Sequence, residues 1–513
     1  MNTRPWTRAA RLVVLCALSP LLFACTASPA EEAATGANSP DAYRAAPAGK
    51  VAAVCGHTKP GPKGAPEDAV EIDPAVDQDL ADKTQSNPPG TTFWLAPGRH
   101  TLGTNEYNSV SPKKGDTYIG APGAVLDGRG KNRYAFVFTA SNVTIKHLTV
   151  TGFVAPANEG VVNHDSGHHW VIEDNTIEKN AGAGLMVGTR DEVRRNCLRD
   201  NGQYGLNAVT VNGNVEDILL EGNEITGNNT DDWESKVEGC GCSGGAKFWA
   251  VDGATIRGNW VHDNRGGGLW ADTNNNDFVF EKNLIEENDG PAVIYETSYN
   301  AIIRYNMIRR NNWVEGRNFA SRGDTFPAPT IYISESGGEP RVHARTNKIE
   351  IYGNDMVDNW SGITLWENAD RFCNSAANSS TGYCTLVQPT LSKCAAPAIA
   401  HKPLLDDCRW KTQRVDIHGN RFAVDANVVR CSTLCARMAV LSNSGTVPDW
   451  SPYKDDTVQQ AITFHQGNAW HDNQYIGPWR FVVFDASTVV DETGWQSDPY
   501  NQDGGSEFTD SGN

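Results

Sequence analysis

Apolar residues and asparagines recur in a fixed phrase through the middle of the chain. An apolar residue is followed three positions later by Asn, then by a second apolar residue, and then by a second Asn, as in Ile172, Asn175, Ile177 and Asn180. Further copies begin at Val193, Leu220, Ile256, Phe280, Ile303 and Ile351. The shortest intervals between successive copies are 21 to 24 residues. Apolar residues so closely spaced between polar turn residues predict short strands, and a repeat of this length predicts a solenoid.

Each repeat is expected to form one coil of an all-β fold, a right-handed single-stranded parallel β-helix. At a tight bend an Asn tolerates left-handed backbone angles and bonds the neighbouring backbone. Stacked Asn side chains can also form a ladder between coils. Crossovers between parallel strands are almost always right-handed. A leucine-rich repeat, the alternative, would need Leu at fixed positions and a helix-like return, whereas the return segments here are rich in Gly and Asn.

One long β-helix domain is predicted over residues 51–500, because a solenoid grows by adding coils. The segment from Pro74 to His100 is expected to be a capping helix followed by an entry strand that covers the N-terminal end of the core. Residues 501–513 are predicted to be a disordered tail. Insertions into the domain are expected to emerge as loops, often on the binding face. They lie near residues 312–329, 369–411 and 430–457.

The N-terminal segment has the pattern of an export signal. Three arginines within the first eleven residues precede an apolar stretch over residues 12–24, which is too short to span a membrane. The sequence Leu-Phe-Ala-Cys ending at Cys25 resembles a bacterial lipobox, with Cys25 as the acylated residue. Residues 1–24 are therefore predicted to be a signal peptide and 25–50 a flexible tether. We expect an envelope lipoprotein, touching the membrane only through Cys25; cleavage near Ala27 would give a secreted protein.

The charge and the number of cysteines limit the classes of partner and indicate how the chain is cross-linked. With 44 basic and 62 acidic residues the formal charge is −18, which argues against nucleic-acid binding. We expect a monomer. Beyond Cys25 the cysteines are even in number, which predicts disulfides in an exported chain. These cysteines are Cys55, Cys197, Cys240, Cys242, Cys373, Cys384, Cys394, Cys408, Cys431 and Cys435.

Acidic residues recur eight positions after the second Asn of a coil. Asp272, Glu296 and Glu367 stand at this place, and Glu335 is the expected counterpart in the interrupted coil. Lys247 lies near the same column on the preceding strand. Earlier coils place Gly or Val at this position, so the fold does not require an acid there. The column is therefore a candidate for chemistry.

Stacking would bring these carboxylates to catalytic distances. Parallel strands lie about 4.8 Å apart, so neighbouring coils place carboxylates about 5 Å apart and alternate coils about 9.5 Å; retaining glycosidases use about 5–5.5 Å and inverting ones about 6.5–9.5 Å. Asp272 and Glu296 are the predicted acid and base or nucleophile, and Glu335, Glu367 and Lys247 complete or position the catalytic site. No cofactor is required for this chemistry. A solvated surface, or a Ca²⁺ site built from carboxylates, is the alternative.

Aromatic residues near the same strands favour a sugar-binding face. Trp270 lies two residues before Asp272 and should share its face, because side chains alternate along a strand. Aromatic rings beside carboxylates suit the binding of a sugar ring. The candidate substrate-binding residues are Trp249, Trp270, Trp366, Arg304 and His262, of which Arg304 and His262 lie on flanking turns, where structural roles are the alternative.

A resemblance supports this interpretation. The region from about Pro97 to Asn473, with its stretches Gly-Gly-Ala-Lys-Phe-Trp ending at Trp249 and Gly-Leu-Trp-Ala-Asp ending at Asp272, resembles the bacterial right-handed parallel β-helix superfamily of pectate-lyase-like folds. It is also loosely similar to lysine-based, calcium-dependent pectate lyases, in which Lys247 would match the base. The paired Asp residues of their calcium turn are absent, and glycines at 266–268 replace them. The resemblance implies a polysaccharide ligand but not the reaction.

The favoured hypothesis is an exported polysaccharide-cleaving enzyme, a glycoside hydrolase that uses the stacked carboxylates. A first alternative is a polysaccharide lyase that performs β-elimination with Lys247 as base. A second alternative is a glycan-binding surface protein without enzymatic activity.

Overall fold

The computed structural model describes residues 51–211, 213–237, 243–368, 410–431, 434–443 and 456–509. The predicted signal peptide, the tether and Cys25 lie outside these residues, as do Cys240 and Cys242 and the four cysteines of the second insertion. Among the described residues, no helix is long and apolar enough to cross a lipid bilayer.

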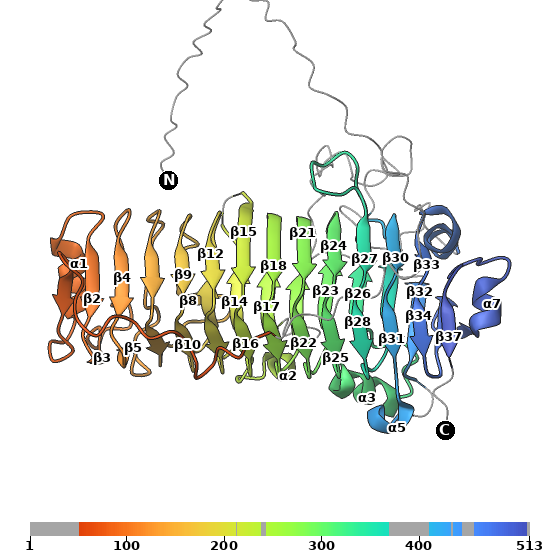
Figure 1. The fold of residues 1–513 in the computed structure, drawn as a ribbon, viewed down its shortest axis with the longest axis horizontal. Helices are drawn as coiled ribbons and strands as arrows, with labels where there is room; N and C mark the ends of the chain where they lie inside the picture. Colours follow the sequence, from red (N-terminus) through yellow and green to blue (C-terminus); the bar gives the residue numbers. More distant parts are fainter. Residues whose placement is uncertain are drawn as a thin grey trace, which may run out of the picture. The chain divides into compact units, whose positions relative to one another are not determined.

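Three long sheets run side by side along the described domain, and each coil adds one strand to each sheet (Figure 1). The first sheet contains β1 (Val70–Ile72), β2 (Thr92–Leu95), β4 (Thr117–Gly120), β6 (Thr144–Lys146), β9 (Val171–Glu173), β12 (Glu192–Arg194), β15 (Val215–Glu221), β18 (Val251–Arg257), β21 (Asn276–Glu281), β24 (Ala301–Arg304), β27 (Ile349–Tyr352), β30 (Val415–His418) and β33 (Ala469–His471). The second sheet contains β3 (Gly98–His100), β5 (Ala124–Asp127), β7 (Thr149–Thr151), β10 (Thr176–Glu178), β13 (Cys197–Arg199), β16 (Glu224–Thr226), β19 (Trp260–His262), β22 (Leu284–Glu286), β25 (Met307–Arg309), β28 (Asp355–Val357), β31 (Arg421–Ala423), β34 (Gln474–Ile476) and β37 (Glu507–Thr509).

The third sheet carries the candidate site. Its strands are β8 (Gly160–Val162), β11 (Ala183–Met186), β14 (Tyr204–Ala208), β17 (Gly244–Phe248), β20 (Gly267–Ala271), β23 (Val293–Glu296), β26 (Ile331–Ser334), β29 (Ile363–Asn368), β32 (Arg437–Asn443), β35 (Arg480–Phe484) and β36 (Thr488–Val490). Neighbouring strands pair in parallel, except that β36 runs antiparallel to β35. The helical segments are α1 (Asp79–Ser86), α2 (Trp233–Lys236), α3 (Trp313–Ser321), α5 (Ala426–Val429), α6 (Thr457–Gln460), the π-helix η4 (Ala461–His465) and α7 (Glu492–Gln496).

The repeated phrase maps onto the coil directly. In the first complete copy Ile172 lies in β9 and Ile177 in β10, and both side chains are buried in the core. Asn175 lies at the bend between these strands, and Asn180 lies at the bend that leads to β11. One copy of the phrase therefore spans two strands and two bends.

The asparagines form two ladders, as the sequence predicts. The Asn175 amide donates to Asn196 Oδ1 of the next coil at 3.0 Å and to the backbone oxygen of Ile145 at 2.9 Å. The left-handed backbone, however, is not at these asparagines, so this part of the prediction was wrong. It belongs to the residue before each of them, for example Asp174 with φ 55° and Lys282 with φ 56°. The asparagines instead satisfy backbone groups that the bends would leave unpaired.

The two ends of the domain are capped. Helix α1 lies at the N-terminal end, where the capping helix was expected (Figure 1). At the C-terminal end, the prediction of a disordered tail over 501–513 was wrong for the described residues up to 509, because β37 pairs in parallel with β34. Asp503, fully buried, accepts the Asn473 amide at 3.0 Å and the Trp495 indole N–H at 2.8 Å. An aspartate therefore ends the first ladder.

Two of the expected insertions contain regular structure. The first holds helix α3. The predicted bounds of the third insertion, residues 430–457, were too broad. Strand β32 lies within them and pairs with β29 and β35. The apolar positions of β32 follow no ladder asparagine, which is why the repeat pattern did not show this strand.

A strap before β1 crosses the outside of several coils (Figure 1). The backbone oxygen of Lys59 lies 2.8 Å from His147 Nδ1, and Cys55 forms a disulfide with Cys197 in β13. The backbone N–H groups of Val54 and Cys55 donate to the Glu224 carboxylate at 2.6 and 2.8 Å. The disulfides expected from the even number of cysteines thus include one that fixes the strap to the solenoid.

Loss of the Cys55–Cys197 disulfide is expected to lower the free energy of unfolding by about 2–4 kcal/mol, because this bond closes a long loop in the unfolded chain; the two residues are 142 positions apart. Urea unfolding of the double Ser variant measures the change. The matched control removes the Cys431–Cys435 disulfide, whose partners are only 4 positions apart. An equal loss from both double variants would contradict the loop argument.

Candidate active site

The outer face of the third sheet gathers most of the predicted site residues. Lys247 in β17 pairs in register with Trp270 in β20, and Trp270 with Ile294 in β23. The neighbouring positions along β17, Ala246 and Phe248, are buried in the core. Because side chains alternate along a strand, Lys247 and Trp270 face outward.

Lys247 and Asp272 form a largely buried ion pair at the centre of this face. Lys247 Nζ lies 3.0 Å from Asp272 Oδ2, and each side chain is 13 % exposed. The ammonium also lies 4.3 Å from the centre of the Trp270 ring, within the range of a cation–π contact. Asp272 Oδ1 accepts the backbone N–H of Thr273 at 2.6 Å and its hydroxyl at 2.9 Å. The Asp272 carboxylate is thus fixed on both oxygens.

Glu296 lies beside Asp272 on the next coil. The two acids directly follow Ala271 and Tyr295, which are paired in register, so their backbones are about 4.8 Å apart. The Trp270 indole N–H donates to Glu296 Oε2 at 3.2 Å. Trp270 therefore contacts both halves of the cluster, the ammonium through its ring and the second carboxylate through its N–H.

Glu335 and Glu367 do not share this column. Glu296 pairs with Ser334, and Ser334 with Trp366, so each of these two acids lies one residue beyond the column. Both are fully buried, Glu335 directly after β26 and Glu367 within β29. Glu335 Oε1 accepts the backbone N–H of Asn368 at 2.9 Å, which is the bonding of a structural carboxylate.

The misalignment has a simple cause in chain length. Val293 and Ile363 occupy equivalent positions at the start of their strands, because both are in register with Ile331. Val293 lies five residues after the ladder residue Asn288, but Ile363 lies only four residues after Asn359. A count of eight from the asparagine therefore reaches Glu296 in one coil and overshoots the column in the other. A shift of one residue turns a side chain to the opposite face of a strand.

Trp366 takes the place in the column that was predicted for Glu367. Its ring centre lies 6.1 Å from that of Tyr332 and 6.3 Å from that of Phe326. Tyr332 is in register with Ile294, so this aromatic group lies on the outer face, on the C-terminal side of Glu296. Trp249 directly follows β17 and is partly exposed on the N-terminal side of Asp272. The carboxylates are therefore flanked by aromatic side chains on both sides.

Comparison with known protein families agrees with the fold described above. Residues 159–381 match the sequence profile of the family described as right handed beta helix region. The domain is a right-handed parallel β-helix. The expected fold class is thereby confirmed. Among curated proteins, none matches the chain.

Several solved structures match the chain at low similarity. The A-module of a mannuronan C-5 epimerase from Azotobacter vinelandii is 15 % identical, with a TM-score of 0.39, over 71 % of this chain and 92 % of its own. The catalytic domain of a GH87 α-1,3-glucanase in complex with tetrasaccharides is 11 % identical, with a TM-score of 0.39, over 60 % and 65 %. A pectate lyase is 12 % identical, with a TM-score of 0.31, over 56 % and 71 %.

The residues around Asp272 do not fit the calcium site of the lyases that the sequence resembles. Asp272 Oδ2 is paired with the Lys247 ammonium, and its Oδ1 accepts two hydrogen bonds from Thr273. Glycines occupy positions 266–268, so the loop supplies no further carboxylate. Within the described ranges there is no group of three or more His, Cys, Asp or Glu side chains placed to hold a metal ion. The Asp272 carboxylate is thus held by the Lys247 ammonium and by Thr273.

Arg304 lies on the first sheet of the β-helix, away from this face. At the end of β24 its guanidinium donates to Glu281 Oε2 at 2.7 Å and to the Tyr352 hydroxyl at 2.9 Å. Burial alone would lower the pKa of Arg304, but these two partners raise it above its ordinary value. The structure thus places Arg304 in an ion pair between coils and not with the candidate site.

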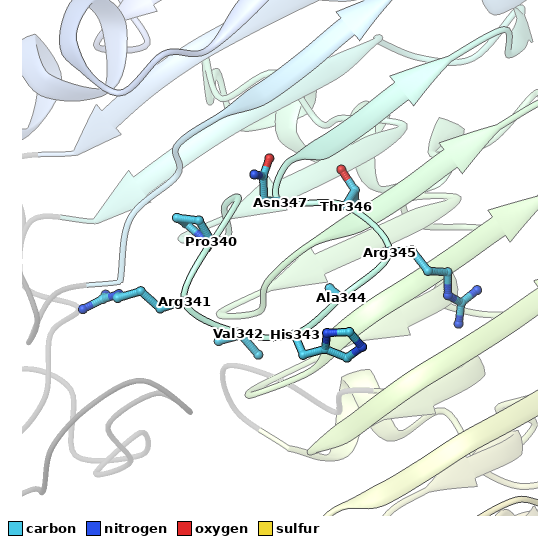
Figure 2. Close-up of a pocket in the computed structure, with 8 residues that line it drawn as sticks. All are labelled: Pro340, Arg341, Val342, His343, Ala344, Arg345, Thr346 and Asn347. Atoms are coloured by element: carbon cyan, nitrogen blue, oxygen red, sulfur yellow. The ribbon is translucent and has the colours of Figure 1, made fainter. Parts of the chain in front are cut away.

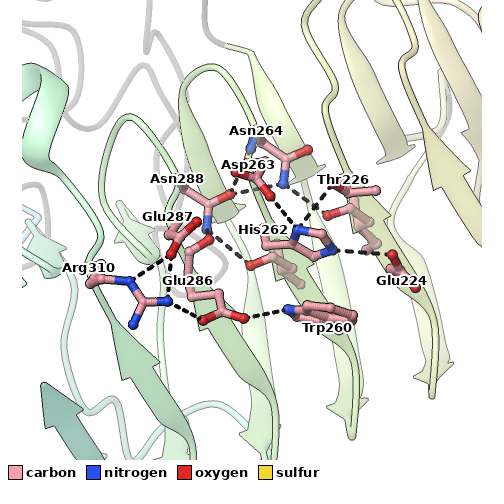
Figure 3. A network of polar contacts seen from close by, with 12 residues as sticks. Glu224, Thr226, Trp260, His262, Asp263, Asn264, Glu286, Glu287, Asn288 and Arg310 are labelled. Carbon is pink, nitrogen blue, oxygen red and sulfur yellow. Dashed lines mark hydrogen bonds and ion pairs between the residues drawn. The ribbon is translucent and has the colours of Figure 1, made fainter. Parts of the chain in front are cut away.

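His262 lies on the second sheet, in the polar network of Figure 3. Its Nδ1 lies 2.6 Å from Asp263 Oδ2, and its Nε2 lies 3.3 Å from Glu224 Oε1. Glu224 also holds the strap through the N–H groups of Val54 and Cys55. His262 is therefore connected to the strap and not to the carboxylates of the third sheet.

His262→Gln is expected to destabilise the protein more at about pH 6 than at about pH 9. Burial alone would lower the pKa of His262, but hydrogen bonds to Glu224 and Asp263 outweigh it and raise the pKa above about 6.5. Burial would likewise raise the pKa of Glu224, but hydrogen bonds from His262 and the strap lower it. The contribution of His262 to the free energy of unfolding is thus complete below about pH 6.5 and is lost as the pH rises above its raised pKa. The contribution of Glu224 is lost as the pH falls through its lowered pKa.

Urea unfolding at the two pH values measures this difference. The control is His465→Gln, because His465 is exposed on η4. A destabilisation by His262→Gln that does not change with pH would contradict the predicted ion pair.

A cavity of 670 Å³ lies elsewhere, within the loop between β26 and β27 (Figure 2). Pro340 to Asn347 line it, and no carboxylate is among them. Arg345 pairs with Asp277 at 2.9 Å, and Arg341 pairs with Glu339 at 2.8 Å. Because both cations are already paired within the protein, the loop cavity lacks the reactive groups of the third-sheet site.

Proposed function

We propose that this protein is an exported glycoside hydrolase that cleaves a polysaccharide on the outer face of the third sheet. The observation that supports the proposal is the cluster of Lys247, Asp272, Trp270 and Glu296, two carboxylates on adjacent coils joined through one indole and one ammonium. Flanking aromatic rings, including Trp249 and the group around Trp366, provide surfaces for sugar rings.

Asp272 is suited to be the nucleophile. The Lys247 ammonium and the two hydrogen bonds from Thr273 stabilise a negative charge on its carboxylate. Glu296 is the partner acid. The spacing of about 4.8 Å between in-register strands is close to the carboxyl separation of about 5–5.5 Å in retaining glycosidases.

The proposed reaction has two displacements. Glu296 donates its proton to the glycosidic oxygen while Asp272 attacks the anomeric carbon, so that the glycosidic C–O bond breaks and a glycosyl ester forms on Asp272. A water molecule then gives its proton to Glu296 and its hydroxyl to the anomeric carbon, which releases Asp272. Lys247 and Trp270 hold the two carboxylates in place throughout.

A β-eliminating lyase with Lys247 as base is the second candidate. It is favoured by the outward position of Lys247 at the centre of the same face. However, an ammonium that acts as a base must first lose its proton and leave the pair with Asp272. The present geometry therefore supports hydrolysis better.

A panel of plant, algal and bacterial polysaccharides, incubated with the purified exported chain with and without a chelator, tests the proposal. We expect new reducing ends, no ultraviolet-absorbing unsaturated ends, and no effect of the chelator. Unsaturated ends would instead establish the lyase. Retention on a polysaccharide without new ends would contradict an enzymatic function.

A further inference from the structure

Phe138 is an exposed aromatic residue in the coil that precedes β8, the N-terminal edge strand of the third sheet. Its side chain is 61 % exposed, whereas Phe136, two residues earlier, is fully buried in the core. The backbone oxygen of Phe136 accepts the N–H of His164 at 3.0 Å, so this segment lies beside β8 and the residues that follow it. The Phe138 ring therefore presents an apolar surface next to the first strand of the third sheet.

The backbone at Phe138 is left-handed, with φ 69°. Alternation along an extended strand would point Phe138 to the same side as Phe136, into the core, and the left-handed backbone breaks that alternation. Later coils also have a left-handed residue shortly after a strand of the third sheet, for example Asn274 with φ 64°. Asparagine tolerates this conformation, but a bulky side chain in it is strained. Neither core packing nor the bend requires a large apolar ring here, so another role must explain it.

Asp165 fixes the Phe138 backbone and lies at the same end of the third sheet as the proposed active site. Its Oδ2 accepts the backbone N–H of Phe138 at 2.5 Å. Residues in register along five strands of this sheet are Val162, Leu185, Leu206, Ala246 and Leu269. Asp165 follows the first of them by three residues, and Asp272 follows the last by three. The two aspartates are therefore four coils apart, about 19 Å along the axis at about 4.8 Å per coil.

Phe138 and Asp165 offer the two kinds of contact that a sugar ring needs. The aromatic ring provides a surface on which the apolar face of a sugar can pack. The Asp165 side chain is 38 % exposed, and its Oδ1 lies 3.9 Å from His164 Nε2, so the carboxylate can accept hydrogen bonds from sugar hydroxyls. Its negative charge would repel a sugar that carries a carboxylate, and the formal charge of −18 on the whole chain acts in the same direction.

We propose that Phe138 and Asp165 form a distal sugar-binding subsite for the polysaccharide that is cleaved at Asp272, and that this polysaccharide is neutral. The coils between them carry Gly188 and Val209 at this end of the sheet, so the path is lined there by small or apolar residues. A polymer that binds at both places is held more tightly than a short chain that reaches only one. This inference rests on the proposed function, since it assigns the substrate class of the same site.

A length series of oligosaccharides tests the subsite separately from catalysis. The parent is Glu296→Gln in the full exported chain, and calorimetry measures its affinity for oligosaccharides from the polysaccharide that the panel identifies. The affinity should rise by about 10-fold once a ligand is long enough to reach from Asp272 to Phe138. Adding Phe138→Asn should remove that rise without lowering the midpoint of thermal unfolding, because asparagine tolerates the left-handed backbone. Adding Val76→Ala, at a position before α1 that is 49 % exposed, is the control and should keep the rise.

Charged ligands and the oligomeric state complete the experiment. Uronic acid oligosaccharides of the same length should bind the parent without the rise, and adding Asp165→Asn should lessen this discrimination. An equal rise in the parent and in the Phe138→Asn variant, or an equal rise for neutral and uronic acid ligands, would overturn the subsite while leaving the proposed hydrolase intact. So would a lower unfolding midpoint of the Phe138→Asn variant, which would mark a structural role.

Two further outcomes concern the ring and the enzyme as a whole. If the parent forms dimers in analytical ultracentrifugation and Phe138→Asn abolishes them, the ring contacts a second copy of the chain and the subsite is overturned. If the parent binds no glycan of any length, or if Glu296→Gln still cleaves, the proposed function fails, and the subsite fails with it.

Discussion

Replacing Asp272 by Asn, or Glu296 by Gln, is expected to lower the rate of polysaccharide cleavage by about 10²–10⁴-fold. An amide in place of the Asp272 carboxylate cannot attack the anomeric carbon, and an amide in place of the Glu296 carboxyl cannot donate a proton to the glycosidic oxygen. Both substitutions keep the side-chain volume, and both positions are partly exposed. The rate of release of reducing ends from the polysaccharide identified by the panel measures the effect.

The two variants should differ in detail. The Asp272→Asn variant lacks the negative charge that lies 3.0 Å from Lys247 Nζ in the native protein, so that ammonium loses its ion pair. Small nucleophiles such as azide are expected to restore part of its activity, because they can replace the missing carboxylate at the anomeric carbon. Substrates with a good leaving group should be cleaved more readily than the polysaccharide by Glu296→Gln, because they need less protonation.

The matched control is Glu350→Gln. Glu350 lies on β27 of the first sheet, between the buried Ile349 and Ile351, and its side chain faces outward on a different side of the β-helix. Its replacement should leave the cleavage rate unchanged. Full activity in both Asp272→Asn and Glu296→Gln would remove the hydrolase proposal.

The fold could be predicted from the sequence because its stabilising contacts repeat. Each copy of the phrase supplies two core residues and two bend asparagines, so seven imperfect copies define the coil, the ladders and the parallel strands. β32 and the C-terminal coil lie beyond the regular copies, and the pattern did not show them. The ladder there ends in Asp503, which accepts the same amide bond as an asparagine but breaks the phrase.

The candidate site could be predicted only where the coil length is constant. Counting from the asparagines aligned Asp272 with Glu296 because their bends are equally long, and it misplaced Glu367 because that bend is one residue shorter. Sequence spacing also cannot show which of the three sheets a residue faces, so His262 and Arg304 were grouped with residues of another sheet.

Asn259→Ala is expected to lower the free energy of unfolding by about 3–6 kcal/mol, because four hydrogen bonds between buried groups are lost at once. Asn259 Oδ1 accepts both the backbone N–H and the side-chain amide of Asn223, at 2.9 and 3.0 Å. Its own amide donates to the backbone oxygen of Leu220 at 3.0 Å and to Asn283 Oδ1 at 3.1 Å. Since Asn259 is fully buried, water cannot replace these bonds. Urea unfolding followed by circular dichroism measures the change.

A control variant distinguishes the effect of removing a ladder asparagine from the effect of removing any asparagine. Asn318→Ala removes an exposed amide on α3 and should change the free energy of unfolding by less than about 0.5 kcal/mol. Asn259→Asp is expected to be destabilising as well, because it places a second acceptor against the Leu220 oxygen and a buried charge in the middle of the ladder. If Asn259→Ala were as mild as Asn318→Ala, the coils would be stabilised by their apolar core alone, and the asparagines would have to be explained by some role other than stability.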